Sequence, residues 1–348
     1  MIKAMTGSII TPRQVRLLFA SVLLVGLAAV LDPVPVFSQN LVSQSFQASW
    51  PDIDLAKEGI DGTALRVLSD DETPPAYDDP ALIPVAIDGI TGNLEPVIAV
   101  EINGVLRAYP MRIVAAHRIV NDTLGGVPIA VTYCRICASA MVFHRVVDEQ
   151  TTNLRLTGAS YDQNIILYDE ASRTWWQQIN GLGLAGRHAD GALDVVPSRL
   201  ISFASFLKQA AKQPGTLILA DSDYSRQPLS LKQTVDLPPL PGMAAGLNST
   251  DRVVIVGKEA WPLELLRKSG RIEQDDLLII WEPGRMATPD YYGADQGQDV
   301  GNITAFSRRG DDLLERETRI QLLHAFFQFS DGEKLHLKRG QEKNEVID

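Results

Sequence analysis

Residues 95–110 read EPVIAVEINGVLRAYP, and this stretch decides the expected fold class. Apolar and polar residues alternate on both sides of Asn103-Gly104. This residue pair suits the positive φ angles of a two-residue hairpin turn. The stretch therefore predicts two antiparallel strands joined at Asn103-Gly104, and we expect a short helix to follow over residues 111–120.

Further apolar runs predict more strands than helices. Strands are expected at residues 127–133, 140–147, 154–157, 165–168 and 216–220. One longer helix is expected at residues 197–211 (PSRLISFASFLKQAA), where apolar residues recur at helical spacing after a serine that suits an N-cap. Together these patterns predict a β-rich α+β fold with short helices between the strands.

A short motif recurs later in the chain. Ala108-Tyr109-Pro110-Met111 has a counterpart in Ala260-Trp261-Pro262-Leu263, 152 residues further on. Each copy follows a β-rich run and precedes a helical stretch and another apolar strand. We therefore expect two related halves that arose by internal duplication, with chance resemblance as the alternative. The second copy has no histidine or cysteine where the first has them, so a site is expected in the first half.

This organisation gives the expected domain boundaries. Residues 39–84 are rich in proline and are expected to form an extended lead-in, with ordered structure starting near Val85. The first half is expected at residues 85–220 and carries the candidate site. A proline-rich linker at 221–246, a degenerate second half at 247–335 and a polar tail at 336–348 complete the chain.

Residues 1–38 have the pattern of a secretory signal peptide. Three basic residues and no acidic one precede an apolar run at residues 17–31, and Val36 and Ser38 suit the small-residue positions of a cleavage site. The run is shorter than the roughly 20 residues of a membrane span. We expect a periplasmic or otherwise extracytoplasmic protein, with an uncleaved anchor as the alternative and no other membrane contact.

Composition excludes several classes of protein. The 348 residues are 45 % hydrophobic and 22 % charged, as in an ordinary folded protein, and two cysteines are too few for a disulfide scaffold. The formal net charge of −11 argues against a nucleic-acid partner. A small-molecule, glycan or protein partner stays open, as does the question of whether the chain is an enzyme.

Both cysteines lie in one motif, Tyr133-Cys134-Arg135-Ile136-Cys137, between two expected strands. Two intervening residues place both sulfur atoms within reach of one metal ion or of each other. His117 and His144 are the candidate further ligands, and Met141 would add a thioether to a Cu(I) site. Sulfur and imidazole ligands favour zinc or copper over calcium or magnesium. A transition-metal site is the leading hypothesis.

Two other interpretations of the cysteine pair stay open. In an oxidising compartment the pair would form a disulfide, and Arg135 between the two cysteines would lower the pKa of the thiol, as a thiol–disulfide redox protein requires. In the second interpretation the disulfide has no redox role and only closes the turn between the two strands.

A polar and aromatic stretch follows at residues 162–178. It contains Asp162, Gln163, Asn164, Asp169, Trp175, Trp176, Gln177 and Gln178. Carboxylates beside tryptophans suggest a glycan- or peptide-binding module, whereas buried tryptophans with polar turn residues are the structural alternative. The GxGxxG match at 181–186 precedes no expected helix, so we expect no nucleotide cofactor.

Two long segments carry a family resemblance. They are residues 108–143 (AYPMRIVAAHRIVNDTLGGVPIAVTYCRICASAMVF) and 156–186 (LTGASYDQNIILYDEASRTWWQQINGLGLAG). Over about residues 85–330 the chain closely resembles the prokaryotic family named domain of unknown function 3179, whose members look like exported proteins. The resemblance marks these positions: His117, Asn121, Asp122, Tyr133, Cys134, Cys137, Gly158, Asp169, Trp175, Gln178 and Gly186.

The chain also departs from the family pattern. Where the family's cysteine motif has proline and glycine, this sequence has Arg135 and Ala138. His144 stands where the family usually shows an acidic residue, which weakens it as a ligand. The resemblance therefore implies which residues belong to the motifs of the family, but it implies no reaction.

Overall fold

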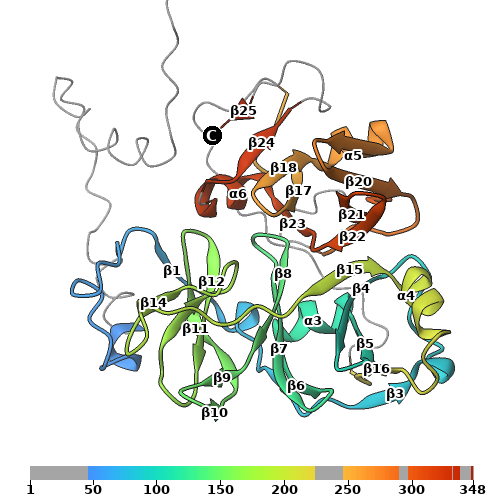
Figure 1. The fold of residues 1–348 in the computed structure, drawn as a ribbon. Helices are drawn as coiled ribbons and strands as arrows, with labels where there is room; N and C mark the ends of the chain where they lie inside the picture. The colour runs from blue at the N-terminus through green and yellow to red at the C-terminus, as the bar shows by residue number, and fades with distance from the viewer. Residues whose placement is uncertain (1–45, 224–245, 290–296, 331, 338–345, 348) are drawn as a thin grey trace, which may run out of the picture.

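A computed structural model describes residues 46–223, 246–289, 297–330, 332–337 and 346–347 (Figure 1). The expected signal peptide and most of the expected linker lie outside the described residues. The described chain forms five sheets of four or five strands and one two-stranded ribbon, and the five larger sheets are arranged like the blades of a five-bladed propeller. The expected β-rich fold with few, short helices is confirmed.

The first sheet contains the opening hairpin, and we call it the β4–β5 sheet. Its order is β15 (Ser198–Ser202), β4 (Pro96–Ile102), β5 (Val105–Pro110), β16 (Leu217–Leu219) and β3 (Leu82–Pro84). Asn103 and Gly104 form the expected turn with φ angles of 52° and 75°. Strand β4 is buried on both faces, because Val97 and Ala99 pack in one apolar cluster and Ile98 in another.

The second sheet, the β6–β7 sheet, follows directly along the chain. Helix α3 (Met111–His117) leads from β5 into it. Its order is β2 (Tyr77–Asp78), β6 (Ile119–Leu124), β7 (Val127–Cys134) and β8 (Ser139–His144). The cysteine motif is therefore the connection between β7 and β8, as expected from the sequence.

The third sheet, the β11–β12 sheet, contains the tryptophan motif. Its order is β1 (Leu65–Val67), β11 (Leu154–Tyr161), β12 (Asn164–Asp169), β13 (Trp175–Gln177) and β14 (Gly183–Ala185). The ribbon of β9 (Val146–Val147) and β10 (Gln150–Thr151) precedes it. Two 3-10 helices, Asp70–Glu72 and Val85–Ile87, lie between the early strands.

The second half forms the remaining two sheets. The β17–β18 sheet has the order β23 (Arg319–Leu322), β17 (Arg252–Val256), β18 (Glu259–Pro262), β24 (Lys334–His336) and β25 (Val346–Ile347). The β20–β21 sheet has the order β19 (Arg271–Gln274), β20 (Leu277–Glu282), β21 (Asn302–Arg309) and β22 (Asp312–Arg316). The helices are α5 (Leu263–Ser269) and α6 (Leu323–Phe329).

The β4–β5 and β17–β18 sheets share one arrangement. In each, a central hairpin has one antiparallel neighbour (β15 or β23) and one parallel neighbour (β16 or β24). A helix follows each hairpin, and the proline before it has nearly the same backbone angles, with φ −57° and ψ 130° at Pro110 and φ −56° and ψ 131° at Pro262.

Three sequence expectations need correction. Ordered structure begins well before Val85, because β1, β2 and β3 all join sheets as edge strands. The expected helix at 197–211 is strand β15 followed by α4 (Phe203–Ala210), whose N-cap Ser202 accepts a hydrogen bond from the Ser205 N–H at 3.2 Å. The expected polar tail contains β25, which pairs with β24.

No helix in the described part of the chain is long and apolar enough to cross a membrane.

Candidate functional site

The two cysteines occupy one buried turn, which we call the dithiol turn (residues 134–138). Cys134 ends β7, and Ala138 closes the turn with a φ of 50°, in the left-handed region that costs a residue with a Cβ about 1–2 kcal/mol. Both thiols are free, and both residues are 0 % exposed. The chain thus holds two unoxidised sulfur atoms inside the protein, two residues apart.

Hydrogen bonds surround both sulfur atoms. The Cys137 N–H donates to Cys134 Sγ at 3.4 Å, and Asn164 Nδ2 donates to Cys137 Sγ at 3.4 Å. Cys137 Sγ also lies 3.3 Å from the Gln163 carbonyl oxygen, so its single proton has two acceptors in reach, that oxygen and Cys134 Sγ. Cys134 therefore accepts hydrogen bonds, which favours its thiolate, whereas Cys137 also donates, which favours its thiol.

The two thiols consequently differ in acidity. Burial works to raise the pKa of Cys134, but hydrogen bonds from the Cys137 thiol and from backbone N–H groups outweigh it and lower the pKa to about 7. Burial and the neighbouring Cys134 raise the pKa of Cys137 well above its ordinary value. The turn therefore pairs one acidic thiol with one that keeps its proton.

A second layer of buried polar side chains holds Asn164 in place. Its Oδ1 accepts from Gln177 Nε2 at 2.7 Å and from the Ile179 N–H at 3.1 Å, and its Nδ2 also donates to Gln178 Oε1 at 3.1 Å. Gln178 Nε2 reaches the turn as well, donating to Thr132 Oγ1 at 3.0 Å and to the Ser139 carbonyl at 3.2 Å. Gln178, a candidate supporting residue from the sequence, thus lies next to the dithiol turn.

The second half covers the dithiol turn. The Leu322 N–H of β23 donates to the Cys137 carbonyl at 2.8 Å, and Ala325 of α6 packs in the same apolar cluster as both cysteines. The Tyr133 hydroxyl donates to the Pro289 carbonyl oxygen at 2.8 Å. Tyr133, another candidate from the sequence, therefore helps to join the two halves.

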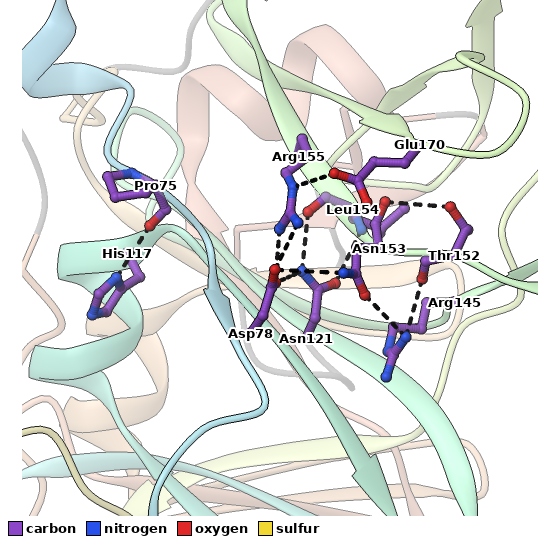
Figure 2. A network of polar contacts seen from close by, with 10 residues as sticks. All are labelled: Pro75, Asp78, His117, Asn121, Arg145, Thr152, Asn153, Leu154, Arg155 and Glu170. Atoms are coloured by element: carbon purple, nitrogen blue, oxygen red, sulfur yellow. Dashed lines mark hydrogen bonds and ion pairs between the residues drawn. The ribbon is translucent and has the colours of Figure 1, made fainter.

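The structure does not bring His117 to the cysteines as a third ligand. Its ring is held elsewhere: Nδ1 lies 3.1 Å from the Pro75 carbonyl oxygen, Nε2 lies 2.8 Å from Asp221 Oδ2, and the ring packs on Tyr77 with centroids 4.9 Å apart. The contact with Pro75 is visible in Figure 2. His117 joins helix α3, the lead-in and the end of the first half.

His144 is also separate from the dithiol turn. It ends β8, whereas Ser139 at the start of β8 adjoins the turn, so about 16 Å of extended strand lies between them. Its N–H donates to the Asp194 carbonyl at 2.9 Å. Across the residues that the structure describes, no three Cys, His, Asp or Glu side chains converge as a metal site would require. The expected four-ligand set is therefore not assembled here.

Asn121 and Asp122 belong to two neighbouring polar networks. Figure 2 shows Asn121 donating to Asp78 Oδ1 at 2.8 Å, while Arg155 holds the same carboxylate through two bonds of 2.7 and 2.6 Å. Asp122 accepts from Arg107 Nη1 at 2.5 Å and from the Tyr109 hydroxyl. Both networks fasten strands together, so these two sequence candidates have structural partners.

Asp169 and the tryptophans lie in the core of the β11–β12 sheet. Trp175 is 0 % exposed and Trp176 is 2 % exposed, and Trp175 packs edge-on against Trp50 with centroids 5.3 Å apart. The Asp169 carboxylate accepts the Trp176 indole N–H at 3.0 Å. Protein covers both rings, as in the structural alternative of buried tryptophans, whereas a glycan- or peptide-binding role of this region stays a prediction.

The glycine-rich segment 181–186 serves close packing. It contains β14, and a Cβ at Gly183 would lie 2.2 Å from the His188 carbonyl oxygen. This close approach of the backbone accounts for the glycine at this position.

A match to a known family spans both halves of the chain. A family model described as protein of unknown function (DUF3179) matches residues 71–342. The chain belongs to this family. The matched range begins before the two segments that carry the resemblance in the sequence. In this DUF3179 chain the strands β2 and β3, which also precede those segments, already belong to the sheets. No curated protein and no solved structure matches the chain.

Some residues of the site could not be identified from the sequence. Asn164 appears there only as part of a polar stretch, yet it contacts a sulfur atom from another sheet. The available signal was a polar residue at the start of an apolar strand, in the run Asn164-Ile165-Ile166-Leu167. Leu322 and Asp221 gave no signal, since their roles depend on contacts with residues more than 100 positions away.

Proposed function

We propose that the dithiol turn is the thiol–disulfide redox centre of an exported protein. The observation that carries the proposal is the arrangement of Cys134 and Cys137 in one turn, with Cys137 N–H and Asn164 Nδ2 each donating to one of the two sulfur atoms. A pair of this kind exchanges two electrons when one sulfur is a thiolate and the other keeps its proton as the second nucleophile.

The proposed reaction uses a disulfide of another protein or small molecule as the oxidant. The Cys134 thiolate attacks one sulfur of that disulfide, forms a mixed disulfide and releases one partner thiolate. Cys137 then loses its proton and attacks the Cys134 sulfur, which releases the second partner thiolate. The turn loses two electrons, which reduce the partner disulfide, and two protons in all are taken up by the partner thiolates. Both sulfur atoms are buried, so the cover formed by β23 and α6 must open first.

The experiment is a redox titration of the full chain. The protein is equilibrated in glutathione buffers of graded potential, and its free thiols are trapped by alkylation and counted by mass spectrometry. We expect a reversible change between two thiols and none, at a potential above the roughly −300 mV that limits structural disulfides. Two thiols in every buffer, or a disulfide that only strong reductant opens, would contradict the proposal. Cys134→Ser provides the control, with one thiol throughout.

A second candidate function is Cu(I) binding by the same turn. Met141 is 4 % exposed and packs in the same apolar cluster as both cysteines, and soft sulfur ligands select Cu(I). Zinc fits less well, since a structural zinc site takes four ligands and His117 and His144 lie elsewhere. Competition with a coloured Cu(I) chelator tests this candidate: we expect one Cu(I) per chain, weakened in Met141→Leu and lost in Cys134→Ser.

We also propose that the two halves arose by duplication of one unit. The support is the shared order and direction of pairing in the β4–β5 and β17–β18 sheets, together with the matching angles of Pro110 and Pro262. Export is the proposed location, supported by the pattern of residues 1–38. N-terminal sequencing of protein recovered from the periplasm tests export, with Gln39 as the expected first residue.

A further inference from the structure

Two arginines of the second half are buried beside the dithiol turn. Arg252 begins β17 and is 3 % exposed, and Arg285 follows β20 and is 1 % exposed. Arg252 is paired across the sheet with Leu322, whose N–H bonds the Cys137 carbonyl. The segment that follows Arg285 contacts both Arg252 and Tyr133, because Arg252 donates to Thr288 and the Tyr133 hydroxyl donates to the Pro289 carbonyl oxygen. The two arginines therefore lie in the region where the two halves join.

The guanidinium of Arg285 has an unfilled donor position. Its Nε donates to the Gly301 carbonyl at 2.6 Å, but Nη2 is buried without a hydrogen-bond partner among the described residues. Asp299 acts on Arg285 electrostatically, yet its carboxylate accepts the backbone N–H groups of Gly284, Arg285 and Gly301 at 2.7–3.1 Å. The Asp299 carboxylate therefore hydrogen-bonds the loop backbone and does not accept from Arg285 Nη2.

Arg252 adds a second guanidinium to the same region. Its Nη1 and Nη2 donate to the Thr288 hydroxyl and carbonyl oxygens at 3.2 and 3.3 Å. Burial, together with the charge of Arg252, lowers the pKa of Arg285 to about 9. A buried cation of this kind is unfavourable unless oxygen acceptors and negative charge compensate it.

We infer that Arg285, with Arg252 beside it, binds a small oxyanion at the junction of the two halves. A planar guanidinium presents parallel N–H groups at the spacing of two oxygen atoms of one carboxylate, phosphate or sulfate. The ligand is small, because Arg285 is almost fully enclosed. This site goes beyond the redox proposal and does not depend on it, since no sulfur atom takes part.

The test measures binding of three probes to the full chain kept in reductant. Inorganic phosphate, sulfate and acetate are titrated separately at constant ionic strength, with chloride as the compensating ion, and binding is followed by calorimetry and by the rise in Tm. We expect saturable binding of about one anion per chain for at least one probe. The three arms separate a tetrahedral oxyanion from a carboxylate.

Variants assign the binding to this site. Arg285→Met keeps most of the length of the side chain and removes its donors, so we expect it to weaken anion binding at least about tenfold. Arg285→Lys keeps the positive charge without the planar pair of N–H donors, so we expect an intermediate effect. Arg271→Met, at an exposed arginine of β19, is the matched control and should bind like the wild type. The inference would be overturned if none of the three probes bound the wild type saturably, and this outcome does not depend on whether the variants fold. It would also be overturned if Arg285→Met bound the anion with the same affinity as the wild type.

Discussion

The Leu322 N–H donates to the Cys137 carbonyl oxygen at 2.8 Å, which connects the edge strand β23 of one sheet to the dithiol turn of another. The bond joins residues 185 positions apart and lies directly beside two free thiols. Ala325, three residues after Leu322, packs in the apolar cluster of the cysteines. A contact between the halves thus lies directly against the thiols.

The first prediction concerns thiol protection. In the reduced native protein both cysteines should react with iodoacetamide at least about a hundredfold more slowly than in unfolded protein, because exposure requires an opening that costs several kcal/mol. Mass spectrometry at successive times measures this. The single variants Cys134→Ser and Cys137→Ser should each retain one protected thiol. Rapid labelling of either cysteine in folded protein would show that the cover is not closed in solution.

The second prediction concerns pH. Because the pKa of Cys134 is lowered from 9.0 to about 7 on folding, the unfolded chain binds more protons between these values. The contribution of Cys134 to the free energy of unfolding should therefore be complete above pH 9 and be lost as the pH falls through 7. Urea unfolding of the reduced protein at several pH values measures it. Subtracting the curve of Cys134→Ser isolates the effect, and a difference that does not grow from pH 7 to 9 would contradict it.

The third prediction concerns Asn164. Asn164→Ala leaves the Ile179 N–H without its acceptor and Cys137 Sγ without its donor, and it removes the shorter of the two hydrogen bonds that Gln177 Nε2 donates. We therefore expect the free energy of unfolding to fall by about 2–4 kcal/mol. Urea unfolding measures it. Asn180→Ala is the matched control and should cost about 1 kcal/mol or less, since among the described residues the Asn180 side chain accepts only from the nearby Leu182 N–H. Equal losses would mean that the buried network is not important.

The fourth prediction concerns the lead-in. Hydrogen bonds from Arg155, with a smaller one from Asn121, lower the pKa of Asp78. Its stabilising contribution is therefore present above the ordinary value of 3.8 and is lost as the pH falls below it. Asp78→Asn should be less stable than the wild type at neutral pH and should lose less stability on acidification. Thermal unfolding at pH 3 and pH 7 measures both, and parallel losses in the two proteins would disprove the role of this carboxylate.

Local signals predicted the parts of the fold that depend on neighbouring residues. The Asn103-Gly104 hairpin was predictable because its turn chemistry lies within the pair itself. The dithiol turn was predictable for the same reason, as two short strands flank a compact motif. At residues 197–211, by contrast, the apolar spacing suits a strand and a helix equally, and only pairing of Leu200 and Ile201 with β4 decides between them.

The lead-in strands were missed for a physical reason. Strands β1, β2 and β3 each lie at the edge of a sheet and are short and only half-buried, and β1 and β2 also lack an apolar run. An edge position also tolerates proline, as Pro84 in β3 shows. The histidines were misassigned as ligands because their spacing from the cysteines is compatible with a metal site, whereas the contacts of His117 with Pro75 and Asp221 depend on distant segments.

The contact between His117 and Asp221 fixes the point at which the chain leaves the first half. The second half is thus tethered beside the surface that it covers, and its return after each opening is an intramolecular event. A tether raises the effective concentration of one half around the other, so contacts too weak to hold two separate proteins together are sufficient here. The opening that the proposed redox exchange requires would therefore be reversed without loss of the cover, which a separate subunit could achieve only at high concentration.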